Sequence, residues 1–141
     1  LNNTDIYSSV ITKNKLIIIV CDNGGFAVIN RLQLFKGGKE YNNLLKSSNT
    51  PGLVDVDFAK HAESMGAKSE HVNSISDLEA AFKRAKASDV TYVISIKTHA
   101  YKWVEGSAFW DSPTLEIPTT KENEEALKLY KEGKGKQRQG V

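Results

Sequence analysis

The sequence has little cysteine, little net charge and no long apolar run. Its 141 residues include one cysteine, Cys21, so no disulfide forms within the chain, as is usual in a reducing compartment. No apolar run approaches the roughly 20 residues that a transmembrane helix needs. The formal charge of +2 gives no strong attraction to nucleic acid or to a membrane surface. A cytoplasmic protein without nucleic-acid or membrane partners is therefore expected.

The first residues also lack two familiar signals. The opening LNNTDIYSSVITKNK has neither an initiating methionine nor the basic and then apolar layout of a secretory signal peptide. A helix is expected already from Thr4 to Lys13, with Ile6 and Val10 on one face and Asn3 or Thr4 as its cap. A chain that opens inside a structural element is expected to be part of a longer protein.

What is present indicates one core with a parallel sheet. The hydrophobic content of 40% suffices for one domain. Leu16–Cys21 is continuous and β-branched, which is typical of a strand buried on both faces, and Cys21 is expected to be a buried thiol that packs as a small hydrophobe. Residues 69–72 and Val90–Lys97 are further predicted strands. Residues 25–35 fit either a helix or a strand, and Lys36–Asp55 is expected to be a long loop.

Two further helices are predicted between these strands. One begins at Asp55 or Asp57 and stops at Gly66, and the other begins with a Ser76-x-x-Glu79 capping box. The resulting alternation of helices and strands predicts an α/β three-layer domain with a parallel sheet and right-handed crossovers.

The segment VCDNGGFAVINR, residues 20–31, carries the strongest candidate site. Asn23-Gly24 between apolar runs fits a two-residue hairpin turn. The alternative is a ligand site, because open α/β sheets bind ligands at the carboxyl ends of their strands. Glycines there let the backbone approach a phosphate, and the amide oxygen of Asn23 suits Mg²⁺.

IVCDNGGFAVINRLQ resembles the second half of the thiamin-diphosphate motif, in which Gly-Asp-Gly is followed, one helix and one strand later, by Asn-Asn. Asp22 replaces the first asparagine of that pair. The resemblance implies that the side chain of Asn23 and the main-chain carbonyl of Gly25 bind Mg²⁺. It also implies that Gly24 and Phe26, together with Asn23 and Gly25, surround the diphosphate of the cofactor.

The Gly-Asp-Gly part of the motif is absent and is expected to lie just before Leu1. The fold expected is thus an N-terminally truncated, pyrophosphate-side thiamin-diphosphate-binding domain. Residues 1–99 are expected to be the C-terminal part of that domain, and residues 100–141 a C-terminal tail with a short charged helix.

The tail FWDSPTLEIPTTKENEEALKLYKEGKGKQRQ resembles the C-terminus of trihydroxycyclohexane-1,2-dione hydrolases, within the acetolactate-synthase-like superfamily. This resemblance implies a C–C bond hydrolase of myo-inositol catabolism that opens a cyclic dione to 5-deoxy-glucuronic acid. Thiamin diphosphate and Mg²⁺ are the implied cofactors. A homo-oligomer, dimeric or tetrameric, is implied for the full-length enzyme.

No catalytic residue is assigned in this chain. His61, His71 and His99 share no metal-ligand spacing, and the basic residues near the end alternate with acids, as in a solvated tail. The family's activating acid belongs to another domain, so the isolated chain is expected to bind cofactor poorly and to be inactive. Two alternatives stay open: an acetolactate-synthase-like lyase or transferase, and a non-catalytic flavodoxin-like phosphate-binding or interaction module.

Overall fold

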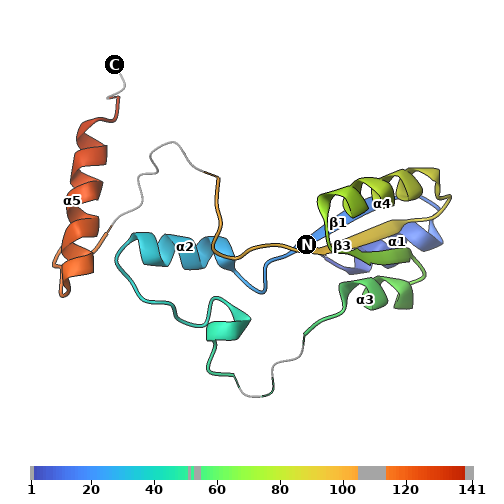
Figure 1. The fold of residues 1–141 in the computed structure, drawn as a ribbon, viewed down its shortest axis with the longest axis horizontal. Coiled ribbons are helices and arrows are strands. Elements are labelled where there is room, and N and C mark those ends of the chain that lie inside the picture. The colour runs from blue at the N-terminus through green and yellow to red at the C-terminus, as the bar shows by residue number, and fades with distance from the viewer. Residues whose placement is uncertain (1, 51, 53–54, 105–113, 139–141) are drawn as a thin grey trace. The chain divides into compact units, whose positions relative to one another are not determined.

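The computed structural model describes residues 2–50, 52, 55–104 and 114–138. They belong to two compact units (Figure 1). The first unit comprises Leu1–Asn23 and Gly52–His99, and the second comprises Gly24–Pro51 and Ala100–Val141. The predicted division into residues 1–99 and 100–141 stays a prediction.

The first unit is built on a three-stranded parallel sheet. Its strands are β1 (Ile17–Asp22), β2 (Lys68–Val72) and β3 (Tyr92–Lys97), in the order β1-β3-β2. Both outer strands pair in parallel with β3, so Tyr92 lies opposite Ile17 on one side and Lys68 on the other. The three predicted strands and their parallel arrangement are confirmed, with boundaries shifted by one or two residues.

Helices cover both faces of this sheet (Figure 1). On one face, α1 (Thr4–Ile11) and α3 (Phe58–Ser64) bury a cluster that includes Val93. On the other face, α4 (Ile75–Ala87) packs against the side chain of Ile94. Because adjacent residues of a strand point to opposite faces, β3 contributes alternately to the two clusters. The predicted α/β fold with three layers is confirmed.

The expected burial of β1 on both faces is wrong. Within the described residues β1 has a hydrogen-bonded neighbour on one side, whereas β3 has neighbours on both sides. Ile19 of β1 is accordingly 41% exposed, while Ile94 opposite it is 0% exposed. Cys21 is exposed too, which corrects the expectation of a buried thiol.

Helix ends follow the sequence signals with one clear shift. Asp57 caps α3 by accepting a hydrogen bond from the Lys60 amide at 3.0 Å, and Gly66 after α3 has a φ of +86°. Ser74, not Ser76, caps α4, because its hydroxyl accepts from the Asp77 amide at 3.1 Å. The expected Ser76-x-x-Glu79 capping box is therefore wrong by two residues.

The ends of α1 also differ from the expectation. The helix ends at Ile11 rather than continuing to Lys13, and Lys13 has a φ of +57°. Asn3 occupies the cap position but its side chain accepts no capping hydrogen bond. The predicted helix is therefore confirmed in place and shortened at its C-terminal end.

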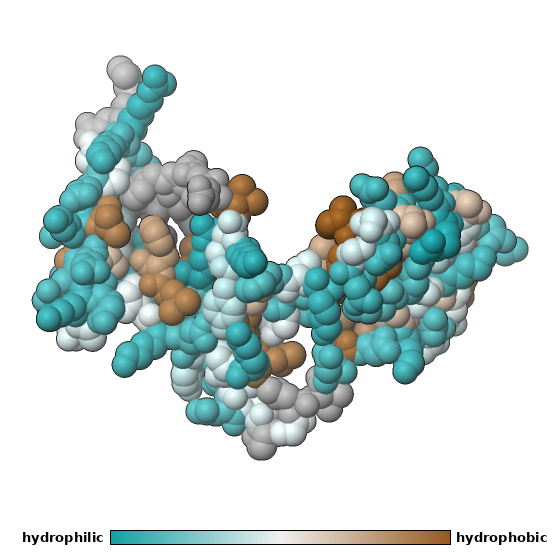
Figure 2. Space-filling view, viewed as in Figure 1, coloured by the Kyte–Doolittle hydropathy of each residue, from teal (hydrophilic) through white to brown (hydrophobic). Residues whose placement is uncertain are grey.

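The second unit contains α2 (Ala27–Phe35), a short 3₁₀ turn η1 (Leu45–Ser47) and α5 (Lys121–Gly135). The ambiguous segment after the glycines is thus helical, and the expected charged helix of the tail is present. Several apolar side chains of α2 are exposed, including Val28 and Phe35. Hydrophilic residues predominate on the face shown in Figure 2, with separate hydrophobic patches.

A close approach joins α5 to the turn after α2. Gly37 has a φ of +80°, and a Cβ there would lie 2.6 Å from the carbonyl oxygen of Glu122. The side-chain amide of Asn123 donates to the Gly37 carbonyl at 2.8 Å.

None of the helices in the described part of the chain is long and apolar enough to cross a bilayer.

Candidate functional site

Asn23 directly follows β1, where β1 and the central strand β3 end together. Asp22 lies opposite Lys97 in the parallel register, and the Thr98 amide donates to the Asp22 carbonyl at 2.8 Å. This hydrogen bond extends the pairing of the two strands by one residue. Asn23 therefore leaves the carboxyl edge of the sheet, the edge at which parallel α/β sheets bind ligands.

Lys97 forms an ion triad with Asp22 and Asp55 at the same edge of the sheet. The Lys97 ammonium lies 2.6 Å from Asp22 Oδ2 and 2.7 Å from Asp55 Oδ1. The Asp22 side chain is only 11% exposed, against 51% for Lys97 and 80% for Asp55. Hydrogen bonds to Asp22 and Asp55 raise the pKa of Lys97 from 10.5 to about 12. The Asp22 carboxylate thus pairs with an ammonium group of its own chain.

The segment Gly24–Phe26 forms an antiparallel bridge within the second unit. The Leu45 amide donates to the Gly24 carbonyl at 2.9 Å, and the Phe26 amide donates to the Asn43 carbonyl at 2.7 Å. These two bonds flank the pair Gly25 and Leu44. In such a pair the polar backbone groups of the middle residue point away from the partner segment, so the Gly25 carbonyl is directed away from residues 43–45.

This geometry excludes the two-residue hairpin. β1 pairs in parallel with β3, so Asn23-Gly24 does not turn β1 back onto an antiparallel neighbour. The bridge partner of Gly25 is Leu44, which lies far along the chain rather than directly after a turn. The hairpin interpretation of the sequence is therefore wrong.

Both glycines adopt backbone conformations that other residues avoid. Gly24 has a φ of +76° and Gly25 a φ of +148°. A Cβ on Gly25 would lie 2.5 Å from the Asn43 carbonyl oxygen, whereas a Cβ on Gly24 would meet no atom within 4 Å. Gly25 is therefore required both for its φ and for the close approach of residues 43 and 44.

This segment offers two oxygen atoms that are suitable ligands for a hard divalent cation, which is part of the set that such a cation needs. The amide oxygen of Asn23 and the carbonyl oxygen of Gly25 are oxygen ligands of the kind that Mg²⁺ prefers. No group of three His, Cys, Asp or Glu side chains in the described ranges is arranged to hold a metal ion. The nearby Asp22 carboxylate pairs with the Lys97 ammonium at 2.6 Å.

Two of the three histidines make surface hydrogen bonds. His61 Nε2 lies 2.9 Å from the side-chain nitrogen of Asn3, and His71 Nε2 lies 3.2 Å from Asn73 Oδ1. His99 follows β3.

The sequence analysis did not identify Lys97 as part of this site. The sequence does contain a signal for it, because Lys97 ends β3 and lies opposite Asp22, which ends the parallel strand β1.

Comparison with known proteins assigns the class. Residues 2–96 match the family described as the thiamine pyrophosphate enzyme, C-terminal TPP binding domain. The chain belongs to this family. The predicted membership of the thiamin-diphosphate enzymes is thus confirmed, while the roles of Asn23, Gly24, Gly25 and Phe26 stay predictions.

Several relatives are similar over almost the whole chain. The 3D-(3,5/4)-trihydroxycyclohexane-1,2-dione hydrolase of Bacillus licheniformis is 30% identical over 130 residues, covering 92% of this chain and 20% of that protein. The protein of the same name from Lacticaseibacillus casei is 31% identical over 132 residues, with the same two coverages. The chain therefore spans about a fifth of the length of these curated relatives.

A solved structure supports the same class. The Rhodococcus jostii RHA1 thiamine diphosphate-dependent 4-hydroxybenzoylformate decarboxylase matches with a TM-score of 0.54 and 27% identity. The match covers 69% of this chain and 17% of the decarboxylase chain. The fold and the family assignment thus agree.

Replacing Lys97 with methionine is expected to lower the free energy of unfolding by about 1 to 2 kcal/mol at neutral pH, because a mostly buried Asp22 carboxylate loses its cation. The folded-state pKa of Lys97 exceeds its ordinary value of 10.5, so this stabilisation is complete below pH 10.5 and disappears as the pH rises through about 12. Urea unfolding of wild type and K97M across this pH range measures the difference.

Lys68→Met is the matched control. Lys68 pairs with Asp89 at 3.3 Å, but both side chains are more than half exposed, at 58% and 88%. Its loss is expected to cost less than about 0.5 kcal/mol. Equal effects of K97M and K68M would contradict a special role for the Lys97 triad.

Proposed function

We propose that this chain is part of a thiamin-diphosphate-dependent and Mg²⁺-dependent C–C bond hydrolase. The proposed reaction opens the ring of trihydroxycyclohexane-1,2-dione to 5-deoxy-glucuronic acid in myo-inositol catabolism. The observation that carries the proposal is the extent of the similarity to proteins named as such hydrolases, which covers 92% of the chain. That similarity extends beyond residue 96, where the match to the general cofactor-domain family ends.

Four consecutive residues are proposed to hold the cofactor and its metal. Asn23 and Gly25 supply oxygen ligands to Mg²⁺, and the backbone of Gly24 and Phe26 lies against the diphosphate. The Phe26 amide donates to the Asn43 carbonyl in this structure, so its use for a phosphate oxygen requires that bond to be exchanged. When bound, thiamin diphosphate supplies a nucleophilic thiazolium carbon for C–C cleavage. The chain's own residues bind and orient the cofactor, and none is assigned as catalytic.

The remaining parts of the proposal concern the whole protein. Residues 1–99 are taken as the C-terminal part of the cofactor-binding domain and residues 100–141 as a tail. The full-length enzyme is proposed to be a cytoplasmic homo-oligomer, either a dimer or a tetramer. Since one amide oxygen and one carbonyl oxygen fill only part of an octahedral shell, the 141-residue chain alone is proposed to bind cofactor weakly and to be inactive.

A second candidate is a lyase or transferase of the same cofactor class. A structural match favours this candidate, because the matched structure is a thiamine diphosphate-dependent 4-hydroxybenzoylformate decarboxylase. Such a decarboxylase shares the cofactor with the proposed hydrolase, but it releases CO₂ from a 2-oxo acid. The two candidates differ in their substrates, so a substrate panel separates them.

The test uses the product of the complete reading frame that contains this sequence, and the 141-residue chain beside it. With thiamin diphosphate and Mg²⁺, the complete product is expected to hydrolyse the cyclic dione and to leave pyruvate and benzoylformate unchanged. The 141-residue chain is expected to show no turnover and no tight binding of cofactor by calorimetry. Turnover of a 2-oxo acid without dione hydrolysis would overturn the hydrolase assignment, and tight cofactor binding by the short chain would overturn its proposed incompleteness.

A further inference from the structure

The chain passes between the two compact units three times. It leaves the first unit after Asn23, returns to it at Gly52 and leaves it again after His99. On the side of the first unit, a charged residue lies within three positions of each passage: Asp22, Asp55 and Lys97. These residues are the three members of the ion triad, so the side chains that flank the passages bind one another.

The triad joins an irregular segment to two paired strand ends. Asp22 and Lys97 are register partners at the ends of β1 and β3, and their strands stay paired through the bond from the Thr98 amide to the Asp22 carbonyl. Residues 55–57 lie in neither a helix nor a strand. The Lys97 ammonium lies 2.7 Å from Asp55 Oδ1 and so ties this segment to the end of the central strand, 42 positions along the chain.

Burial of one carboxylate gives the triad its direction. In the described ranges Lys97 is the one cation whose ion pairs bridge two carboxylates. The Asp22 side chain is 11% exposed, and a carboxylate withdrawn from water to that extent holds its cation firmly. Asp22 therefore fixes the ammonium, and the ammonium fixes Asp55. Because two carboxylates already balance its charge, Lys97 is poorly suited to bind a phosphate directly.

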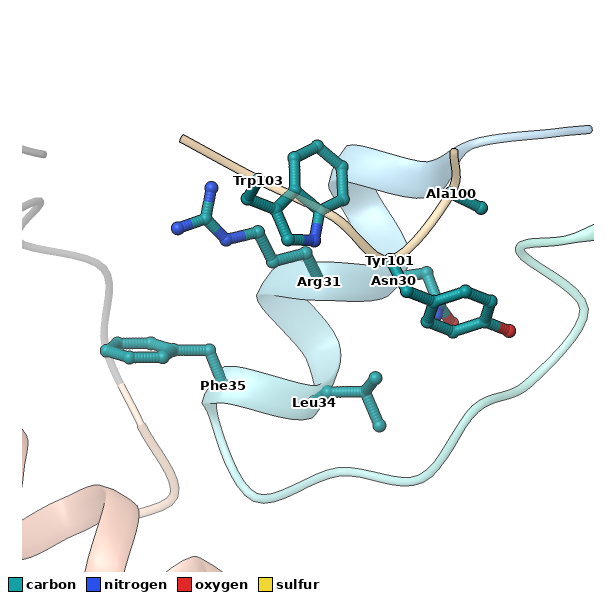
Figure 3. Close-up of a pocket in the computed structure, with 7 residues that line it drawn as sticks. All are labelled: Asn30, Arg31, Leu34, Phe35, Ala100, Tyr101 and Trp103. Carbon is teal, nitrogen blue, oxygen red and sulfur yellow. The ribbon is translucent and has the colours of Figure 1, made fainter. Parts of the chain in front are cut away.

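The segments that follow two of the passages meet again inside the second unit. Helix α2 follows the first passage and residues 100–103 follow the third. Figure 3 shows Trp103 beside Arg31 of α2, with 5.0 Å between the guanidinium and the centre of the ring. These segments are thus held by their own packing in the second unit and by the triad in the first. The short stretch that begins with Asn23 lies between the two attachments.

We infer that Lys97 is a positioning residue: by holding Asp22 and Asp55 together, it fixes the direction in which Asn23 leaves the sheet. Asn23 is the next residue after Asp22, so a shift of Asp22 also moves the amide oxygen of Asn23. The consequence for the cofactor rests on the proposed function, in which that oxygen binds Mg²⁺. This ion demands near-octahedral geometry, and loss of a group that holds a metal ligand in place typically costs about tenfold to a hundredfold in affinity.

The first test measures backbone order in the 141-residue chain by ¹⁵N relaxation. The order parameters of Asn23 and Val56 are expected to be about 0.8 in wild type and to fall below about 0.6 in Lys97→Met. Lys97→Arg keeps a cation that can bridge two carboxylates, so it is expected to restore both values. Lys68→Met, which breaks an exposed pair, is the matched control and is expected to change neither. Ile94 in the core is expected to stay at about 0.85 in every variant, because a change in global stability leaves the order of the folded molecules unchanged.

The second test measures the Kd of thiamin diphosphate by calorimetry, in saturating Mg²⁺, on the product of the complete reading frame. Lys97→Met is expected to weaken binding at least about tenfold, Lys97→Arg by less than about threefold, and Lys68→Met not at all. Far-UV circular dichroism identifies any variant that fails to fold.

Asp55→Asn separates positioning from direct binding of the diphosphate. It removes the exposed arm of the triad and leaves the pair of Lys97 with Asp22 intact. As a positioning defect it is expected to weaken thiamin diphosphate about threefold and to lower the order parameter of Val56. A lysine that bound the diphosphate directly would instead be freed by this change, and the cofactor would bind more tightly.

Three results would overturn the inference: unchanged order of Asn23 in K97M, unchanged cofactor affinity in K97M, or tighter cofactor binding by D55N. Failure of the proposed function has a different signature, because a complete wild-type protein would then bind no thiamin diphosphate at all. The relaxation measurements on the 141-residue chain would still decide whether Lys97 fixes Asn23.

Discussion

Ile94→Ala is expected to lower the free energy of unfolding of the sheet-containing unit by about 3 kcal/mol. Ile94 is 0% exposed and sits in the central strand β3. Its side chain belongs to the cluster that α4 covers, together with Val72, Ala81 and Ala85. Two of these neighbours are alanines, which cannot extend into the space left by the lost atoms. The variant therefore loses both transfer free energy and packing contacts.

Ile19→Ala is the matched control for this prediction. Ile19 is the direct partner of Ile94 in the parallel register, but it is 41% exposed on the edge strand β1. The same chemical change there is expected to cost about 1 kcal/mol, mainly through β-propensity and partial burial. Urea unfolding followed by far-UV circular dichroism measures both variants. Similar losses at the two positions would contradict the assignment of β3 as the buried centre of the sheet.

The difference between these two isoleucines marks what the sequence predicts and what it does not. Uninterrupted β-branched runs predicted both strands, because few other elements bury such runs. Their order in the sheet was not predictable: IIIVCD contains more aliphatic residues than YVISIK, yet the latter is the central strand. Strand order is set by how the crossover helices pack, which a single run of residues does not encode.

Local chemistry left a similar ambiguity at the start of α4. The sequence contains Ser74 three residues before Asp77 and Ser76 three residues before Glu79, and both pairs fit a cap followed by an acid. The structure selects Ser74, whose φ of −141° and ψ of 165° are those of a capping residue, while Ser76 lies inside the helix. The choice between the two pairs is a choice of where the first turn of α4 begins, and that depends on the packing of α4 onto the sheet.

The candidate site was predictable to the extent that it is local. The position of Asn23 at the end of β1 follows from the apolar run before it and the glycines after it. The contacts of the site are long-range: Asp22 meets Lys97 from the neighbouring strand, and the Gly25 segment meets residues 43–45 from a loop. Neither partner has a spacing signature, since their proximity results from chain folding between distant positions.

Gly25→Ala is expected to disrupt the segment that carries the proposed metal ligand. The new Cβ would lie 2.5 Å from the Asn43 carbonyl oxygen and 3.0 Å from Leu44 Cα, and both contacts are with backbone. Relief requires residues 43–45 to move away, which breaks the bonds from Phe26 to Asn43 and from Leu45 to Gly24. Together with the unfavourable φ, the cost is expected to be about 3 kcal/mol. Amide hydrogen exchange of Phe26 and Leu45 should then accelerate by about a hundredfold.

Gly24→Ala separates the clash from the backbone strain. Gly24 also has a positive φ, +76°, but a Cβ there meets no atom within 4 Å. G24A is therefore expected to cost about 1 kcal/mol and to raise the exchange of the same two amides by less than about tenfold. Equal exchange rates in G24A and G25A would show that the approach of residues 43 and 44 does not restrain this segment. In the complete enzyme, G25A is expected to lose more affinity for thiamin diphosphate than G24A. The reason is the backbone clash at residue 25, which displaces the carbonyl proposed to bind Mg²⁺ and which G24A does not create.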